Sequence, residues 1–142
     1  MSTSVETILL DTDVLTDLMR NPQGAAHASL HLRLQQVQDL RVLTSVVVDC
    51  AIRFGLLRKA SVRMDKAYED LLQVVEVAPL EPDAVAHYSA LRLHLERMGQ
   101  PIGPHGMLIA AHALALDATL VSADAGFGRV PGLRVENWLQ AA

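Results

Sequence analysis

The stretch TILLDTDVLTDLMR, residues 7–20, predicts how the chain begins to fold. Its first four residues, TILL, form a short apolar run that is typical of a buried strand. From Asp13 onward the apolar residues recur at helical spacing, and the run ends before Asn21-Pro22. A strand that passes into a helix at Asp11 is the first half of a β-α-β unit. Such units favour a parallel sheet with helices packed against it.

The same alternation continues along the rest of the chain. We expect further strands at 41–44, 73–79, 118–122 and 133–138, and helices at about 24–38, 45–59, 62–72, 81–99 and 105–117. Apolar strands that alternate with helices predict an α/β fold of three layers, α/β/α, with a central parallel sheet. The sequence contains no repeat or linker, so we expect a single domain over residues 1–142.

Composition narrows the class of protein. The net charge of -4 gives no general attraction to nucleic acid, so RNA binding would need a local basic face. Cys50 is the one cysteine, which excludes an internal disulfide and fits a reducing compartment. The N-terminal residues lack the basic segment of a signal peptide, and no apolar run is long enough to span a membrane. We therefore expect a cytoplasmic protein without a membrane segment.

Two acids follow predicted strands, at the edge where α/β sheets place their sites. Asp11 follows the first strand, and Asp124 follows the fourth, two residues after Ser122. Carboxylates that converge there could bind a hard cation such as Mg²⁺, which prefers oxygen ligands. The alternative is that Asp13 and Asp124 only cap the next helical segments and Asp11 braces the turn. The residues alone leave both interpretations open.

Three segments together resemble a known family. ILLDTDVLTDLMR (8–20), TSVVVDCAIRFGLLRK (44–59) and GQPIGPHGMLIAAHALALDATLVSADAGFGRVPGLRVENW (99–138) are similar, in order and spacing, to PIN-domain ribonucleases of the VapC toxin type. The resemblance implies an α/β/α sandwich, and for active members RNA hydrolysis that depends on Mg²⁺ or Mn²⁺. It also implies a homodimer and a VapB-like antitoxin whose C-terminal segment lies across the active site. The last segment resembles most the members that cut initiator tRNA.

The chain departs from the family pattern at two of its four acidic positions. Asp11 and Asp124 match the first and fourth acids, and Ser122 matches a serine or threonine beside the fourth. The family glutamate of the second motif aligns with Ala51, and the aspartate of the third aligns with Gly106. Asp49 lies about 200° around the helix from Ala51, so we expect it to cap that helix instead of replacing the lost acid.

The loss of two acids predicts weak Mg²⁺ binding and slow or absent RNA cleavage. Asp11 and Asp124, supported by Ser122, would then be the surviving metal-facing and catalytic residues. A non-catalytic PIN module that binds an antitoxin or RNA is the alternative, and a purely structural domain would be favoured if Asp11 and Asp124 lay far apart. The sequence favours inactivation of a once-active enzyme over natural decay, and leaves open whether Ala51 and Gly106 are native.

A basic stretch is the candidate RNA-binding surface. Arg53, Arg58 and Lys59 lie within the densest run of cations in this acidic chain. Such a run could face RNA phosphates. The alternative is an ordinary solvated helix face, and the residues do not decide between the two.

Overall fold

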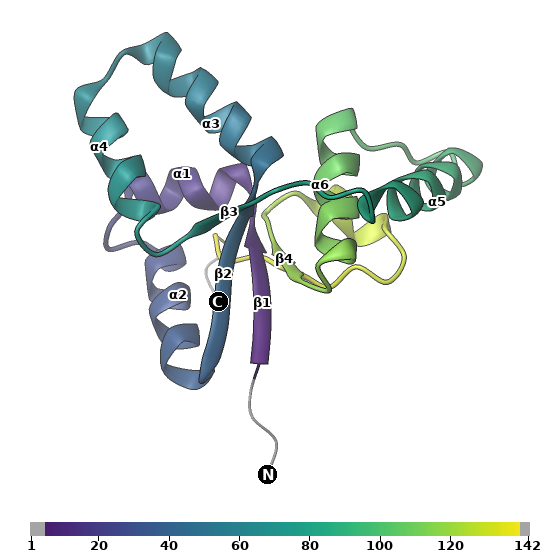
Figure 1. Ribbon diagram of the computed structural model, residues 1–142, viewed down its shortest axis with the longest axis horizontal. Helices are drawn as coiled ribbons and strands as arrows, with labels where there is room; N and C mark the ends of the chain where they lie inside the picture. The colour runs from purple at the N-terminus through teal and green to yellow at the C-terminus, as the bar shows by residue number, and fades with distance from the viewer. Residues whose placement is uncertain (1–4, 140–142) are drawn as a thin grey trace.

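Five parallel strands form the centre of the fold (Figure 1). The computed structural model describes residues 5–139. The strands lie in the order β3-β2-β1-β4-β5, and every neighbouring pair is parallel. Their bounds are β1 (Val5–Leu10), β2 (Asp39–Ser45), β3 (Glu76–Ala78), β4 (Thr119–Val121) and β5 (Val135–Glu136).

Helices cover both faces of this sheet, which confirms the predicted three-layer α/β/α fold. They are α1 (Thr12–Arg20), α2 (Ala25–Gln36), α3 (Val46–Lys59), α4 (Val62–Leu71), α5 (Ala84–Arg97) and α6 (Pro104–Ala115), with a 3₁₀ helix η1 (Ala125–Arg129). Figure 1 shows α1 to α4 on one side of the strands and α5 and α6 on the other. Right-handed crossovers between parallel strands explain this division. The chain steps across the sheet from β1 to β2 to β3 and then crosses back to β4 in the opposite direction, so the helices of the return crossover lie on the other face. Within the described residues, no helix has the length and apolar character needed to cross a membrane.

β1 is the strand on which the sheet is built. It pairs with β2 along its full length, from Val5 opposite Asp39 to Leu10 opposite Thr44. On its other side it pairs with β4. The strand order reverses between β1 and β4, and the carboxyl ends of strands at such a point flank a crevice in α/β sheets.

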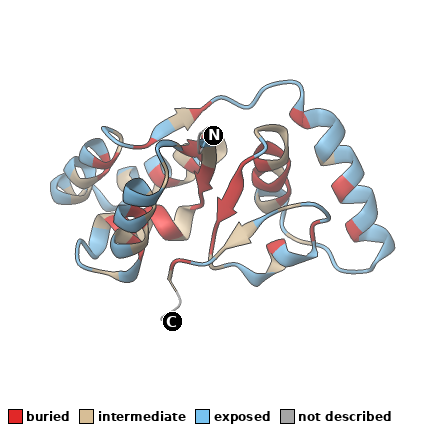
Figure 2. Ribbon diagram, turned by 90° about the horizontal axis from the view of Figure 1, so that it is seen from below, coloured by how far each residue is buried: buried red, intermediate tan, exposed pale blue. Residues whose placement is uncertain are grey.

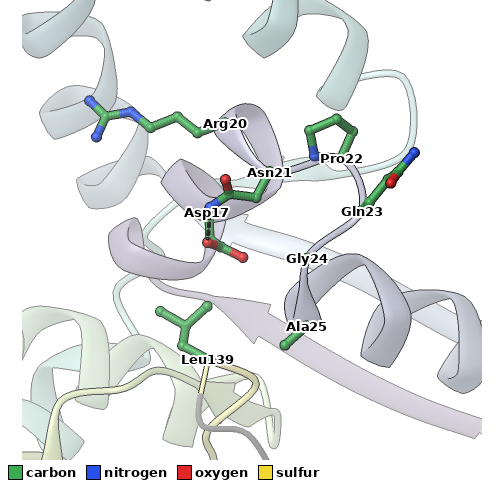
Figure 3. A pocket seen from close by; sticks show the side chains of 8 residues that line it. All are labelled: Asp17, Arg20, Asn21, Pro22, Gln23, Gly24, Ala25 and Leu139. Carbon is green, nitrogen blue, oxygen red and sulfur yellow. Dashed lines mark hydrogen bonds between the residues drawn. The ribbon is translucent and has the colours of Figure 1, made fainter.

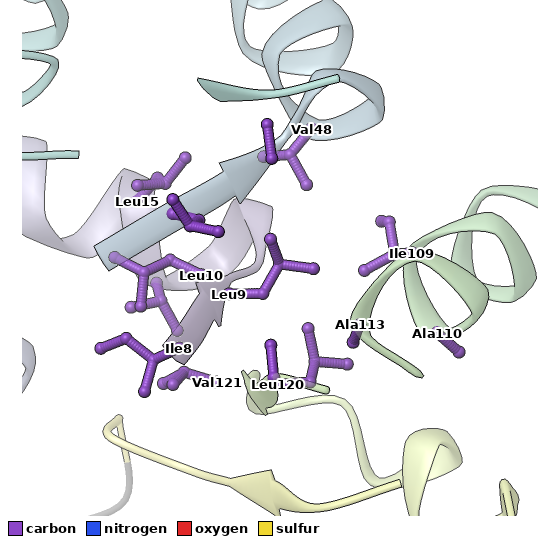
Figure 4. Close-up of a cluster of buried hydrophobic side chains, with 14 of the residues drawn as sticks. Ile8, Leu9, Leu10, Leu15, Val48, Ile109, Ala110, Ala113, Leu120 and Val121 are labelled. Carbon is purple, nitrogen blue, oxygen red and sulfur yellow. The ribbon is translucent and has the colours of Figure 1, made fainter. Parts of the chain in front are cut away.

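An aliphatic core surrounds β1 and β4 (Figure 4). Ile8, Leu9 and Leu10 are fully buried, as are Leu120 and Val121. Figure 2 shows buried residues concentrated in the strands and on the helix faces turned towards them. Two buried strands in contact at the centre therefore hold the residues that follow them in a defined position.

The largest differences from the predicted elements lie at their ends. The strand expected over 73–79 is shorter, because the amides of Val74 and Val75 donate to the Leu71 carbonyl and extend the end of α4 as a turn. The helix expected over 81–99 begins at Ala84, since its amide closes a turn on the Glu81 carbonyl. The 3₁₀ helix η1 was not predicted from the sequence.

We expect Leu9→Ala to destabilise the fold by about 2–5 kcal/mol, because the substitution leaves a cavity beside fully buried strands. The matched control is Leu32→Ala, at a leucine that is 51% exposed on α2, which should change stability by less than about 0.5 kcal/mol. Urea unfolding of both variants measures the difference. Equal effects would contradict this account of the core.

Candidate active site at the carboxyl ends of β1 and β4

A hydrogen-bonded chain of side chains joins the ends of β1 and β4. Asp11 follows β1, and its amide donates to the Val121 carbonyl at 3.0 Å, which extends the pairing with β4 by one residue. Ser122 Oγ donates to Asp11 Oδ2 at 2.7 Å and accepts from the Asp124 amide at 3.1 Å. The structure therefore brings Asp11, Ser122 and Asp124 together, so the condition that favoured a purely structural domain is not met.

Asp11 also begins α1. Its Oδ1 accepts from the Thr12 amide at 2.8 Å, which makes Asp11, and not Asp13, the N-terminal cap of that helix. Asp124 caps in the same way, because its Oδ1 accepts from the Gly126 amide at 2.8 Å at the start of η1. Capping and a place in the site are thus compatible. Asp11 is buried, whereas Asp124 is exposed.

Asp13 also contacts this site, although it was not among the predicted site residues. Its Oδ2 accepts from the Ala123 amide at 2.9 Å, so α1 is tied to the segment that follows β4. Its Oδ1 is buried and has no hydrogen-bond partner among the described residues. The available signal was its spacing of two from Asp11, but the contact with Ala123 bridges 110 positions of sequence.

Electrostatics set Asp11 apart from the other acids. Burial raises the pKa of Asp11, and the hydrogen bonds from Ser122 and the Thr12 amide partly oppose that rise. The nearby negative charges of Asp13 and Asp124 raise the pKa further. The site therefore carries concentrated negative charge that the fold itself does not balance, and this is the environment in which a bound cation is stabilising.

Gly106 lies beside Phe127 of η1, the short helix that Asp124 caps. It is in the first turn of α6, and a Cβ added there would meet Ile102 at 3.6 Å and the Phe127 ring at 3.7 Å, both ordinary contacts. A Cβ added at Gly126 would lie 3.2 Å from Ile102 and 3.1 Å from Asp124 Oδ1. A side chain at position 106 thus has room beside Ile102 and Phe127, and the backbone does not require glycine there.

Ala51 lies in a cleft that begins one residue from Asp11. We call this space of about 210 Å³ the α1–α3 cleft; it is lined by Thr12, Thr16, Met19, Arg20, Ala51, Ile52, Gly55, Leu56, Lys59 and Met64. Thr12 adjoins Asp11, so position 51 faces the cleft beside the β1 end of the site. The family acid that Ala51 replaces would lie in this cleft.

Asp49 does not replace the missing acid, and its predicted capping role is wrong. Ser45 caps α3 instead, because its Oγ accepts from the Val47 amide at 3.0 Å. Asp49 Oδ1 accepts from Tyr68 Oη at 2.7 Å and from Arg53 Nε at 3.0 Å. Burial, followed by the charge and hydrogen bond of Asp49, raises the pKa of Tyr68. Asp49 therefore joins α3 to α4.

The three predicted RNA-binding cations have different environments. Arg53 pairs with Asp49 and lies 5.3 Å from the Tyr68 ring centre. Arg58 lies 5.6 Å from the Phe54 ring centre. Only Lys59 reaches the α1–α3 cleft, where Arg20 also lies. The sequence did not predict a role for Arg20, because its approach to Lys59 depends on the packing of α1 against α3.

A buried histidine links the helices that carry positions 51 and 106. His112 on α6 is 1% exposed, and its Nδ1 lies 2.8 Å from Oγ of Ser45, the cap of α3. Burial lowers the pKa of His112, and the Pro79 carbonyl and the charges of Asp83 and Glu81 oppose that change. This contact fixes α3 and α6 relative to each other on either side of the crevice.

A second hollow of about 570 Å³ lies at the turn between α1 and α2, and Arg20 lines both this hollow and the α1–α3 cleft (Figure 3). Its lining includes Asp17 and Asn21, whose side chains hydrogen-bond at 2.6 Å, and Leu139. None of its lining residues hydrogen-bonds to Asp11, Ser122 or Asp124. We therefore place the candidate chemistry at the strand ends.

The oxygen donors of the site suit a hard cation in kind but fall short in number. Carboxylate oxygens are the ligands that Mg²⁺ and Mn²⁺ prefer. Within residues 5–139, however, no three His, Cys, Asp or Glu side chains are grouped closely enough to hold a metal ion. Ala51 and Gly106 supply no oxygen from their side chains. The described residues thus offer suitable oxygen donors but no group of three that would hold a metal ion.

The fold and the site together define the class of protein. The family model of the PIN domain matches residues 8–133. The match covers most of the chain, so the chain belongs to the PIN-domain family, and the predicted resemblance is confirmed. PIN ribonucleases are generally dependent on divalent metals.

Within this family the similar proteins are VapC ribonucleases. Ribonuclease VapC2 of Rickettsia felis is 27% identical over 132 residues, which are 92% of this chain and 96% of the relative. The tRNA(fMet)-specific endonuclease VapC of Shigella flexneri is 28% identical over 131 residues, with the same coverage of 92% and 96%.

Solved toxin–antitoxin complexes share the fold. VapBC2 from Rickettsia felis bound to a promoter DNA fragment gives a TM-score of 0.83 at 26% identity, over 93% of this chain and 98% of that chain. VapBC-1 from nontypeable Haemophilus influenzae gives 0.79 at 25% identity, over 94% and 99%. The predicted VapC relationship is therefore confirmed for nearly the whole length.

We expect Asp11→Asn to stabilise the protein at pH 7. The pKa of Asp11 is higher in the folded state than its ordinary value of about 3.9. The folded state therefore loses stability relative to the unfolded state as the pH rises from about 3.9 through the folded-state pKa. Asparagine removes that loss and keeps an acceptor for the Thr12 amide. Thermal unfolding from pH 3.5 to 8 should show a gain that disappears towards low pH.

The control for this substitution is Glu69→Gln, at an exposed residue of α4, which should change stability by less than about 0.5 kcal/mol at all these pH values. A lower unfolding midpoint for Asp11→Asn at pH 7 would show that burial does not disfavour the charge of Asp11.

We expect Gly106→Ala to raise stability by roughly 0.5–1 kcal/mol, because the helical position is unstrained and the added Cβ has room. Gly106→Asp should gain less without metal, since its charge adds to those of Asp11 and Asp124. Mg²⁺ should then raise the melting temperature of Gly106→Asp but not of Gly106→Ala. Destabilisation by alanine would contradict the open space beside Phe127.

Proposed function

We propose that this chain is a VapC-like toxin whose catalytic centre for RNA hydrolysis is incomplete. The substrate class is RNA, and initiator tRNA is the proposed target because two relatives carry the name tRNA(fMet)-specific endonuclease. The observation that supports the proposal is the joining of Asp11, Ser122 and Asp124 at the strand ends. The neutral residues Ala51 and Gly106, at two positions where the family has acids, are the proposed reason for low activity.

The chain's own residues prepare this site. Ser122 holds Asp11 Oδ2 and the Asp124 amide, so the two acids keep a defined separation. Asp13 fixes the start of α1 against the end of β4. A divalent cation held by Asp11 and Asp124 would supply activation of a water molecule and would offset the charge that develops on the phosphate. Asp11 and Asp124 are the proposed ligands. Positions 51 and 106, where the family has two further acids, contribute none in this chain.

We propose Mg²⁺ or Mn²⁺ as the cofactor, bound weakly here because two of the four family carboxylates are missing. We further propose a VapB-like antitoxin and a second copy of the chain as partners, in the cytoplasm where the proposed tRNA substrate occurs. The similarity to VapBC complexes supports the antitoxin. The absence of a three-residue metal cluster in residues 5–139 supports the alternative function, a non-catalytic PIN module that binds an antitoxin or RNA.

The test is to restore both acids as Ala51→Glu with Gly106→Asp. In metal sites, substituting a residue that only supports a ligand lowers metal affinity or activity by roughly 10–100-fold. Restoring two ligands themselves should therefore raise the rate of tRNA cleavage by at least roughly 10–100-fold. The activity should require Mg²⁺ or Mn²⁺ and disappear with EDTA. Gel analysis of tRNA fragments measures it.

The matched control is Ala51→Gln with Gly106→Asn, which restores size without charge and should remain as inactive as the starting chain. Adding Asp11→Asn to the restored protein should abolish cleavage. If the restored protein is folded and still inert with both metals, the proposal of an incomplete nuclease is wrong and the binding module is supported.

A further inference from the structure

The α1–α3 cleft holds two positive charges and no acid. Arg20 lies at the end of α1, and Lys59 lies at the end of α3. Neither cation forms an ion pair with any residue in the described part of the chain. Of the arginines on α3 and α4, Arg53 pairs with Asp49, whereas Arg58 and Arg63 have no ion pair within residues 5–139. Two unpaired cations on one small cleft indicate an anionic ligand.

Besides the two cations, the cleft is lined by two threonines, by small residues and by apolar side chains, the last being Met19, Ile52, Leu56 and Met64. Thr12 and Thr16 are one helical turn apart on α1, so their side chains line the same wall. Ala51 and Gly55 face them from α3 and leave the middle of the cleft open. The hydroxyl groups can donate to anionic oxygens, and no side-chain carboxylate of the lining repels them.

We propose that the α1–α3 cleft binds an RNA phosphate directly, without a divalent metal. This inference rests on the proposed function, because it specifies how the same protein holds its RNA. Ala51 is central to it. A glutamate at position 51 would place a negative charge among Arg20, Lys59 and the incoming phosphate, and a cation would then be needed to offset that charge. With alanine there, the two basic side chains attract the phosphate unopposed.

The walls of the cleft favour RNA over an acidic peptide. They are helical, so an extended peptide would find no strand edge to pair with its backbone amides and carbonyls. At about 210 Å³ the cleft is also small for an amphipathic helix, but it can admit a phosphate group. A phosphodiester has no backbone donors to satisfy, and it is a natural ligand for arginine and lysine.

The experiment measures binding of a fluorescein-labelled anticodon stem-loop RNA by fluorescence anisotropy in EDTA. The starting chain should bind, and Mg²⁺ in place of EDTA should leave the affinity within about twofold. Arg20→Gln with Lys59→Gln should weaken binding about tenfold or more at low salt. Each lost contact to a single strand lowers the slope of log affinity against log salt by about 0.7, so the slope should fall by about 1.4.

The matched control is Arg63→Gln with Arg97→Gln, which removes the same charge from two exposed residues outside the cleft. Its affinity should stay within about twofold of the starting chain. Ala51→Glu should bind RNA weakly in EDTA and regain affinity with Mg²⁺. Circular dichroism confirms that each variant is folded.

Three results would overturn the inference. The first is that the starting chain binds RNA only with Mg²⁺, and the second is that the Arg20/Lys59 and Arg63/Arg97 double variants lose RNA affinity equally. The third is that poly-glutamate, at equal charge, displaces the labelled RNA as effectively as unlabelled RNA does. The third result would assign the cleft to acidic peptides. If the chain with restored acids cuts RNA but the cleft pair binds normally, only this inference fails. If the cleft pair loses binding but the restored chain is inert, only the proposed catalysis fails.

Discussion

The hydrogen bond from Ser122 Oγ to Asp11 Oδ2 is the contact on which the site depends. It joins residues 111 positions apart in sequence, and it is possible only because β1 and β4 are adjacent and parallel. The buried leucines of β1 fix that adjacency, since they pack against β4 on one side and β2 on the other. Core packing and site geometry are therefore one constraint in this protein.

The site combines opposite charges at the two ends of α1. Asp11 and Asp13 lie at its start, where burial and mutual repulsion disfavour the negative charge of Asp11. Arg20 lies at its end and lines the α1–α3 cleft together with Lys59 of α3. The acidic start of α1 is suited to a cation, and its basic end is suited to an anion such as the proposed phosphate. The loss of acids changes the balance between these ends without changing the helix.

The sequence predicted the layers of the fold and the two principal acids, because both depend on local patterns. An apolar run that ends in an aspartate is visible in the sequence at Asp11 and at Asp124. The bond between Asp13 and the Ala123 amide was not visible, since it depends on how α1 meets β4. The basic surface was predicted on Arg53, Arg58 and Lys59. Asp49 pairs with Arg53 and the Phe54 ring lies against Arg58, whereas Arg20, which the sequence did not indicate, lines the same cleft as Lys59.

The residue types, rather than the backbone, distinguish this site from a four-acid site. His112 and Ser45 still hold α6 against α3, and the turn from Gly103 into α6 is regular. The packing of α3 against α6 is therefore kept although positions 51 and 106 carry no charge. Fold similarity to VapC proteins over nearly the whole chain is in keeping with this retention.

Position 106 has a consequence for the history of the protein. Its backbone is not in the left-handed region, and a new side chain there would meet only ordinary contacts with Ile102 and Phe127. Glycine and aspartate codons, like alanine and glutamate codons, can differ by a single nucleotide. A lineage that carries this chain can thus pass between a charged and a neutral form of the crevice by point mutation, with no compensating change in the scaffold.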